Sequence, residues 1–405
     1  MTEGRQSSDI AIEDTIRDVG NDLAETLRSV IEAVPGRPRR PNQLARELGL
    51  NRAISSRVLS ATARKDPLEV THIIPGPEPL RSLLRAAAEK DVEAALIGRA
   101  EAAVSRFERL ITAEAGTRSR LDAIISARLP GAREKLELSS KYAVFNGMSQ
   151  LMGVQAETWL TSMLYHPSAA DPARLDVASI HGALGMQRLR PGVAVHFSFG
   201  KAPPTSWSMD RDDVPIGSMP LEEFYTNPPA RLRAQQNEEE LVHTFIGDEV
   251  GPSAAVDMLA ADHHAGAIGR YAPEGVSRKR GGAVLPDIPA KTLIFDMVLH
   301  EEVFPGSDPV LDVYNAGLRG RPDVNDPRRD VDVMDVQESI EFLGRGAARV
   351  HAPEVPNYTD MLRYVCGQLD WDIEAFRTYR CRVQYPVHGW VVCMSFIPPA
   401  VRSNA

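Results

Sequence analysis

The stretch Pro41-Asn42-Gln43-Leu44-Ala45-Arg46-Glu47-Leu48-Gly49-Leu50-Asn51-Arg52-Ala53-Ile54-Ser55-Ser56-Arg57-Val58-Leu59 decides how the N-terminal part of this chain folds. Apolar residues recur at helical spacing on both sides of Gly49, which predicts two helices joined by a tight turn. Glycine adopts the left-handed conformation of such a turn at little cost. Asn51 follows it, and asparagine is a favoured N-cap, so the second helix is expected to begin there.

The second helix of this pair is expected to have an apolar side and a polar side. Its spacing predicts that Ile54, Val58 and Leu59 are buried. Arginine on an exposed helix can reach guanine in a major groove, and serine can reach phosphate. The residues expected to contact DNA, including three in the preceding loop, are Arg37, Arg39, Arg40, Asn51, Arg52, Ser55, Ser56 and Arg57.

Charge is spread unevenly along the 405 residues. The net charge is -9, which argues against a uniformly basic protein that coats nucleic acid. Residues 35–66 nevertheless contain only two acidic residues, Glu47 and Asp66, against a basic island formed by Arg37, Arg39, Arg40, Arg46, Arg52, Arg57, Arg64 and Lys65. Such an island is typical of a local binding surface for a polyanion. A solvated helix face is the alternative.

The pattern Leu44-Ala45-x-x-Leu48-Gly49-Leu50, followed by Ser56-Arg57-x-Leu59, resembles the helix-turn-helix of bacterial winged-helix regulators of the MarR and IclR type. The resemblance covers residues 23–80. It departs from the usual pattern at Ser55, where an apolar residue normally stands. It implies a DNA-binding domain, and the β-branched residues 68–74 are then expected to form one strand of a wing. A helical hairpin within a larger α domain is the alternative.

Helical spacing also dominates the segments around this motif. Residues 9–34 are expected to form a helix with a break at Gly20-Asn21, after a disordered tail over residues 1–8. We assign residues 9–78 to the DNA-binding domain and residues 79–152 to a helical connector that dimerises. The connector contains a stripe that would either pair two subunits or fill an intramolecular core: Leu96, Ala100, Ala103, Phe107 and Leu110.

Residues 153–405 follow a different pattern, with frequent prolines and glycines and alternating apolar residues. We expect an α+β domain there, which senses an effector or assembles with a partner. The expected strands are 157–165, 174–187, 193–199, 291–304, 378–385 and 389–397, with the last two forming a hairpin. The expected helices are 238–245, 253–263, 335–343 and 358–376.

Catalytic and cofactor-binding motifs are not evident. The sequence has no nucleophile elbow, no phosphate-binding loop and no dinucleotide fingerprint after a strand. Asp262-His263-His264 and His300-Glu301-Glu302 contain metal-ligand residue types, but adjacent histidines on a helix point about 100° apart. Hydrogen bonding at helix ends is therefore expected there rather than a metal site. A candidate ligand pocket would use His196, His300, Tyr385 and Trp390.

These features favour a dimeric regulator that binds double-stranded DNA and responds to a small effector or a protein partner. An enzyme with its active site in the C-terminal domain, or a protein-interaction scaffold, is the alternative. The three cysteines lack metal-binding spacing and are expected to stay reduced in a cytoplasm. No run of about 18 apolar residues is present, so no membrane segment is expected.

Overall fold

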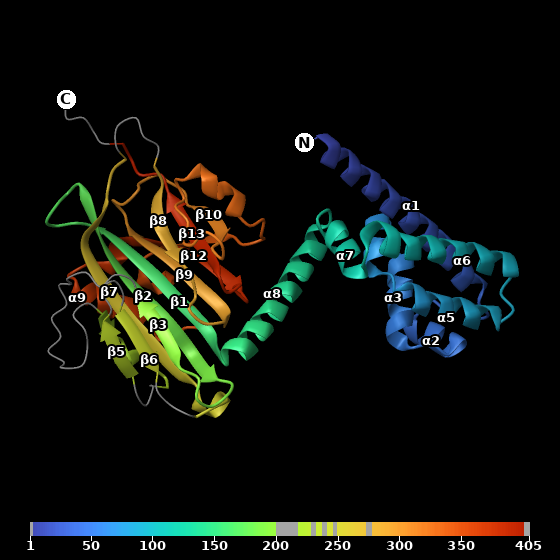
Figure 1. The fold of residues 1–405 in the computed structure, drawn as a ribbon, viewed down its shortest axis with the longest axis horizontal. Coiled ribbons are helices and arrows are strands. Elements are labelled where there is room, and N and C mark those ends of the chain that lie inside the picture. The colour runs from blue at the N-terminus through green and yellow to red at the C-terminus, as the bar shows by residue number, and fades with distance from the viewer. Residues whose placement is uncertain are drawn as a thin grey trace. The chain divides into compact units, whose positions relative to one another are not determined.

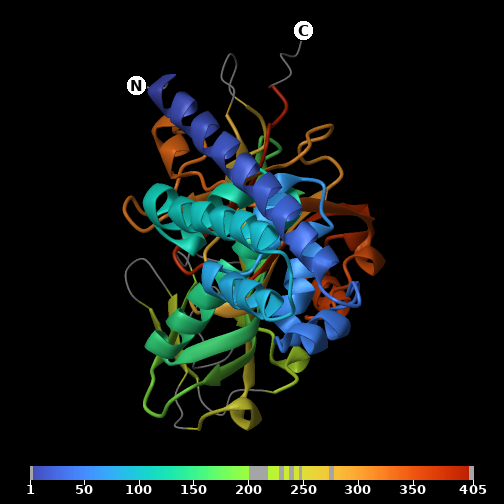
Figure 2. The same ribbon diagram turned by 90° about the vertical axis from the view of Figure 1, so that its right-hand side faces the viewer.

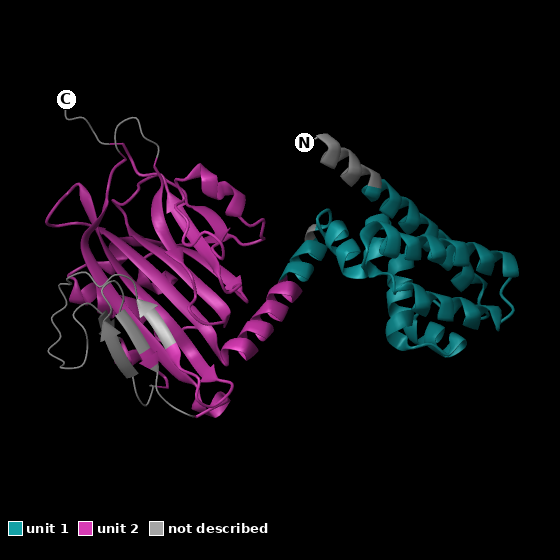
Figure 3. Cartoon of the chain, in the orientation of Figure 1, with its two compact units in different colours: residues 1–137 teal, residues 138–405 magenta. Residues whose placement is uncertain are grey.

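The computed structural model describes residues 3–199, 218–227, 232–236, 241–245, 249–272 and 278–400. The chain divides into two compact units, residues 1–137 and residues 138–405 (Figure 3). Unit 1 is helical in its described residues, whereas unit 2 is built mainly from β-sheet. The combination of a helical N-terminal region and a larger C-terminal sheet region agrees with the α+β class predicted from the sequence.

Unit 1 is built around the long helix α1, which lies across the bundle and contacts α4 and α6 (Figure 2). One core includes residues from all its helices up to α7, among them Leu27, Leu44, Val58, Leu80 and Phe107. The helices are α1 Glu3–Ala33, α2 Pro41–Leu48, α3 Arg52–Thr62, α4 Pro67–Ile73, α5 Pro77–Ala88, α6 Ala94–Arg109, the π-helical turn η1 Leu110–Ala115, α7 Arg118–Ser126 and α8 Pro130–Met152, which continues into unit 2.

The wing strand predicted at residues 68–74 is wrong, because this segment forms helix α4. Pro67 occupies its first turn, and the Asp66 carboxylate accepts a hydrogen bond from the amide of Leu68 at 3.0 Å. Proline at the first position and an aspartate N-cap both favour helix initiation. These signals, with packing against α1, outweigh the strand preference of the β-branched residues.

The predicted break at Gly20-Asn21 is also wrong, because α1 continues through it. A Cβ at Gly20 would lie 2.2 Å from the carbonyl oxygen of Pro67, so the glycine allows α4 to approach α1. Helix α1 begins at Glu3, inside the segment expected to be a disordered tail. The possible dimer stripe lies in the core of unit 1: Ala100, Ala103, Phe107 and Leu110 are buried, and Leu96 packs against them.

The main sheet of unit 2 has seven strands in the order β11-β12-β9-β1-β2-β7-β4 (Figure 1). Neighbouring strands are antiparallel except β1 and β9, which are parallel. The strands are β1 Val154–Pro167, β2 Arg174–Arg188, β4 Ser218–Pro220, β7 Val256–Gly269, β9 Ala290–His300, β11 Ile340–Arg345 and β12 Phe376–Gln384.

Two smaller sheets, one further helix, the C-terminal part of α8 and several short turns complete the described part of unit 2. One small sheet has the order β10-β13-β8, from Val310–Asn315, Trp390–Phe396 and Arg280–Val284. The other has the order β3-β6-β5, from Val195–Phe199, Leu241–Phe245 and Leu232–Gln236. The helix is α9 Tyr358–Gln368, and the short 3₁₀ turns are Glu222–Phe224, Pro252–Ala254, Pro327–Asp332, Ala347–Arg349 and Ile373–Ala375.

The main sheet separates two apolar layers. Strand side chains alternate between the faces of a sheet. On β9, Phe295 and Met297 accordingly join the core shared with β8 and β13, whereas Ile294 and Val298 join the core shared with α9. Both faces of the central strands are thus covered, and α9 and the β10-β13-β8 sheet lie on opposite sides.

Six predicted strands of the C-terminal region are present as β1, β2, β3, β9, β12 and β13. The hairpin is wrong, because β12 pairs with β9 and β11 whereas β13 pairs with β10 and β8. The helices predicted at 238–245, 253–263 and 335–343 are also wrong where described, since β6, β7 and β11 occupy these segments. Strand β7 is buried on both faces along most of its length, which removes the alternation that identifies a strand. The helix predicted at 358–376 ends at Gln368.

Candidate nucleic-acid interface

The predicted pair of helices and the turn between them are present as α2 and α3. Helix α2 ends at Leu48, and its C-cap Gly49 is left-handed with φ 62°. The amide of Leu50 donates to the carbonyl of Ala45 at 2.9 Å, which closes the end of α2. The side-chain oxygen of Asn51 accepts from the amide of Ala53 at 2.7 Å and caps α3. Asn51 therefore orients α3, which is a structural role beside the expected contact with DNA.

Helix α3 is rotated relative to the expected burial pattern. Ser55 is fully buried together with Val58, whereas Ile54 and Leu59 are only partly buried. The Ser55 hydroxyl donates to the carbonyl of Asn51 at 3.2 Å, so a small polar side chain is satisfied inside the core. The expectation that Ser55 faces outward is wrong.

The exposed side of α3 consists of Arg52, Ala53, Ser56 and Arg57. Residues at these spacings form one continuous strip on a helix. Ala53 was not among the residues expected to contact DNA, although the same helical period places it on this strip once Ser55 is in the core. This strip begins at the N-terminus of α3, so the exposed Arg52 stands directly after the turn.

Arg57 is engaged with the protein itself. Its Nε donates to the carbonyl of Ile73 at 3.0 Å and its Nη2 donates to the carbonyl of Ile74 at 3.1 Å. These carbonyls lie at the end of α4, where backbone acceptors lack partners within the helix. Arg57 therefore joins α3 to α4, and its guanidinium is less free to contact DNA than the sequence suggested.

The remaining cations of the basic island divide into paired and unpaired groups. Arg46 pairs with Glu47 at 3.3 Å and Arg64 pairs with Glu69 at 3.5 Å. No described residue forms an ion pair with the other exposed cations, Arg37, Arg39, Arg40, Arg52 and Lys65. Exposed positive charges without acidic partners attract anions most effectively.

The candidate ligand residues of unit 2 are not brought together. His300 is the last residue of β9. Tyr385 follows β12 at the opposite end of the β9–β12 pair, and its amide donates to the carbonyl of Lys291. Trp390 begins β13 in another sheet, and His196 pairs with Thr244 in the β3–β6 ladder. The His196 side chain lies outside the described residues. The Tyr385 ring instead packs on Tyr142 and Phe145 of α8, with centroid distances of 5.0 and 5.4 Å.

Imidazole and indole rings gather at one end of the main sheet. The His166 ring stacks on Trp371 at 4.9 Å and meets His300 at 4.7 Å. Burial, together with the nearby His166, lowers the pKa of His300, and burial lowers the pKa of His263. His263 and His264 lie on strand β7, so the expected helix-end role is wrong. Within the described residues, no group of three or more potential ligands is arranged to hold a metal ion.

A buried polar network lies between the main sheet and α9. Arg380 contacts Asp296 through two hydrogen bonds of 2.9 and 2.7 Å, and the Tyr358 hydroxyl donates to the same carboxylate at 2.6 Å. Ser162 extends the network to Tyr358 at 2.6 Å. All four side chains are almost completely buried, so the network holds α9 on the sheet and is closed to a substrate.

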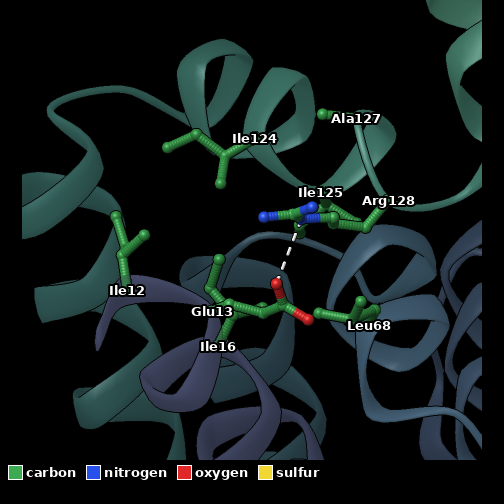
Figure 4. Close-up of a pocket in the computed structure, with 8 residues that line it drawn as sticks. All are labelled: Ile12, Glu13, Ile16, Leu68, Ile124, Ile125, Ala127 and Arg128. Carbon is green, nitrogen blue, oxygen red and sulfur yellow. Dashed lines mark ion pairs between the residues drawn. The ribbon is translucent and has the colours of Figure 1, made fainter. Parts of the chain in front are cut away.

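Unit 1 contains an open cavity of about 420 Å³ between α1, α4 and α7 (Figure 4). Its charged lining residues are Glu13 and Arg128, whose Oε2 and Nε atoms are 3.1 Å apart. Its apolar lining residues are Ile12, Ile16, Leu68, Ile124, Ile125 and Ala127. No local sequence pattern reveals this cavity, because its walls combine residues 12–16, Leu68 and residues 124–128.

Comparison with protein-family models and with curated proteins found no match to this chain. None of the helices in the described ranges combines the length and the apolar character that crossing a bilayer requires. The functional assignment therefore depends on the geometry of the α2–α3 pair and on its charges.

Proposed function

We propose that unit 1 is a helix-turn-helix DNA-binding domain and that the protein regulates transcription. In this proposal α2 is the first helix of the motif and α3 is the recognition helix. The observation that carries the proposal is the exposed N-terminal half of α3, with Arg52 unpaired among the described residues directly after a capped turn. In helix-turn-helix proteins this part of the recognition helix contacts base edges.

Each exposed residue has a specific proposed role. Arg52 pairs with guanine, and Ala53 contacts a thymine methyl group. Ser56, one turn further along α3, reaches a phosphate oxygen. The loop before α2 supplies sequence-independent phosphate contacts through Arg37, Arg39 and Arg40. Pro38 is buried between them, which fixes the course of this loop.

The proposed domain has no wing at residues 68–74. Helix α4 occupies that segment, and Arg57 binds its C-terminal carbonyls. Specificity therefore depends on α3 and on the preceding loop, rather than on a β-hairpin in the minor groove.

We further propose that the protein is a homodimer and that it works in a cytoplasm. A single motif of this size reads few base pairs, and a dimer gains specificity from two half-sites about one helical turn apart. The stripe in α6 is buried in the unit 1 core, so another surface must form the dimer. Unit 2 would sense an effector or bind a protein partner.

Fluorescence anisotropy with duplex DNA tests the proposal. First, a duplex is selected from a random pool with the intact chain. Arg52→Ala should weaken binding to the selected site by about 1–3 kcal/mol and relax the preference at one base pair. Arg39→Ala/Arg40→Ala should weaken binding to every duplex and lower the salt slope by about 2.

Arg99→Ala is the matched control, because Arg99 is an exposed arginine on α6, outside the proposed interface. It should leave both the affinity and the salt slope unchanged. If the Arg39/Arg40/Arg52 triple variant binds duplex as tightly as the unmodified chain, the assignment is wrong. Absence of duplex binding by the unmodified chain would favour a protein-interaction role for unit 1.

A further inference from the structure

We propose that the cavity between α1, α4 and α7 binds a small amphiphilic carboxylate, which acts as the effector of the proposed DNA-binding domain. The binding site stands on the geometry of unit 1 alone, whereas the effector role rests on the proposed function. The occupant has an apolar body and one carboxylate group.

The walls of the cavity select an apolar body. Six of the eight lining residues are apolar: five come from α1, α4 and α7, and Ala127 is the C-cap of α7. A volume of about 420 Å³ falls in the range of about 300–1,000 Å³ that is typical of small-molecule sites. Figure 4 shows Ile124 and Ile12 on the walls around the space that the Arg128 side chain enters.

The charges of the cavity favour a carboxylate. Arg128 contacts Glu13 through its Nε at 3.1 Å, and no described residue binds the other edge of its guanidinium. That edge presents two parallel N–H donors, which match a carboxylate. Arg17 donates to the other oxygen of Glu13 from Nε at 3.2 Å and from Nη2 at 2.9 Å. Glu13 therefore remains compensated when Arg128 turns toward a ligand.

A cationic ligand is disfavoured by the same arrangement. It would have to displace a guanidinium from Glu13, and the released Arg17 or Arg128 would then lie beside it. Like charges at such short range repel each other. The pair Arg17 and Arg128 thus gives the cavity its preference for anions.

The cavity is connected to the proposed recognition helix through α4. Leu68 lines the cavity, and Arg17 contacts Asp66, the N-cap of α4, at 3.4 Å. At its other end α4 supplies the carbonyls that bind Arg57 of α3. A ligand that contacts α1, α4 and α7 together favours one position of α4, and it thereby shifts the position of α3.

Calorimetric titration of the intact chain with octanoate and with 1-octanol tests the site. Octanoate should bind at least about tenfold more tightly than 1-octanol, because its carboxylate accepts charge-assisted hydrogen bonds from Arg128 and the hydroxyl of 1-octanol does not. Arg128→Gln should remove this preference while 1-octanol still binds, which shows that the cavity is intact. Arg120→Gln is the matched control, because Arg120 is an exposed arginine on α7 that does not line the cavity, whereas Arg128 follows the end of this helix.

A second pair of variants tests the location. Ala127→Phe should weaken the binding of both compounds, because the larger side chain fills the cavity. Ala123→Phe is the control, because Ala123 lies on α7 one turn before Ala127, is also exposed and does not line the cavity. Absence of octanoate binding, or equal binding of both compounds in all variants, would overturn the proposed site.

Duplex affinity measured with and without octanoate tests the effector role. A change in duplex affinity on addition of octanoate, if it is absent in Arg128→Gln, supports the effector role. Octanoate binding with unchanged duplex affinity would overturn the effector role while the site stands. If the chain binds octanoate and no duplex, the proposed DNA-binding function fails and the carboxylate site remains.

Discussion

At the scale of single residues, two helical glycines of unit 1 have opposite surroundings. A Cβ at Gly20 would lie 2.2 Å from the Pro67 carbonyl oxygen and 2.7 Å from the Thr71 hydroxyl, so α1 and α4 are in contact there. A Cβ at Gly98, within α6, would meet no atom within 4 Å. Gly20 is therefore required by packing, whereas Gly98 has no such constraint.

We expect Gly20→Ala to destabilise unit 1 by about 1–3 kcal/mol, the usual cost of overpacking, because the nearest atom is backbone. Gly98→Ala, the matched control, should stabilise it by about 0.5–1 kcal/mol through helix propensity. Urea unfolding of the intact chain, followed by circular dichroism at the helix band, measures both. A stabilising Gly20→Ala would contradict the close contact between α1 and α4.

The sequence alone did not determine which residues of α3 face outward in the proposed interface. Helical period alone allows either Ile54 or Ser55 to face the core, since the two differ by about 100°. The hydroxyl of Ser55 bonds to its own helix, so the core accepts it. Contacts such as Arg57 with Ile73 join residues 16 positions apart, and no local pattern encodes them.

At the scale of elements, α9 is attached to the main sheet by both apolar and ionic contacts. Its Tyr358 donates to Asp296 on β9, and Arg380 on β12 holds the same carboxylate. The remaining guanidinium donors of Arg380 reach the carbonyls of Val350 and His351 in the segment before α9. One buried ion pair thus fixes two strands, one helix and one loop.

We expect Arg380→Met to destabilise unit 2 by about 3–5 kcal/mol, because it leaves the Asp296 carboxylate buried without its cation. Arg382→Met on the same strand should cost less than about 1 kcal/mol, because Arg382 forms a partly exposed pair with Glu354. Tryptophan fluorescence during urea unfolding reports on unit 2 alone, since all four tryptophans lie beyond residue 138. Equal losses in the two variants would refute the role of the network.

A central strand was predictable where β-branched and aromatic residues mark it, as in β9, and was not where alanine dominates, as in β7. Strand β9 was recognised because its residues are apolar and β-branched over a limited length. Strand β7 was taken for a helix because its buried, alanine-rich residues do not alternate. Strands that are adjacent in a sequence usually pair with each other. Strands β12 and β13 instead belong to different sheets, and this depends on contacts that are distant in the sequence.

At the scale of the whole molecule, the boundary between the two units falls inside helix α8. The sequence changes character at residue 153, where α8 has ended, but the core of unit 2 already includes part of the helix. Lys141 forms an ion pair with Glu338, and Phe145 packs on Tyr385. Lys141, Phe145 and Ser149 recur at helical spacing and are buried, so residues 138–152 belong with the sheet.

We therefore expect a fragment of residues 138–405 to unfold at higher urea concentration than a fragment of residues 153–405. The shorter fragment leaves Glu338 without its cation and Tyr385 without its ring contacts. In the intact chain, Phe145→Ala should destabilise unit 2 by about 3–5 kcal/mol, whereas Val144→Ala, on the exposed side of α8, should change its stability by about 0.5 kcal/mol or less. Tryptophan fluorescence during urea unfolding measures the stability of the two fragments and of the two variants. Identical unfolding of the two fragments, together with an unaffected Phe145→Ala, would place the boundary after α8 and leave that helix as a separate connector.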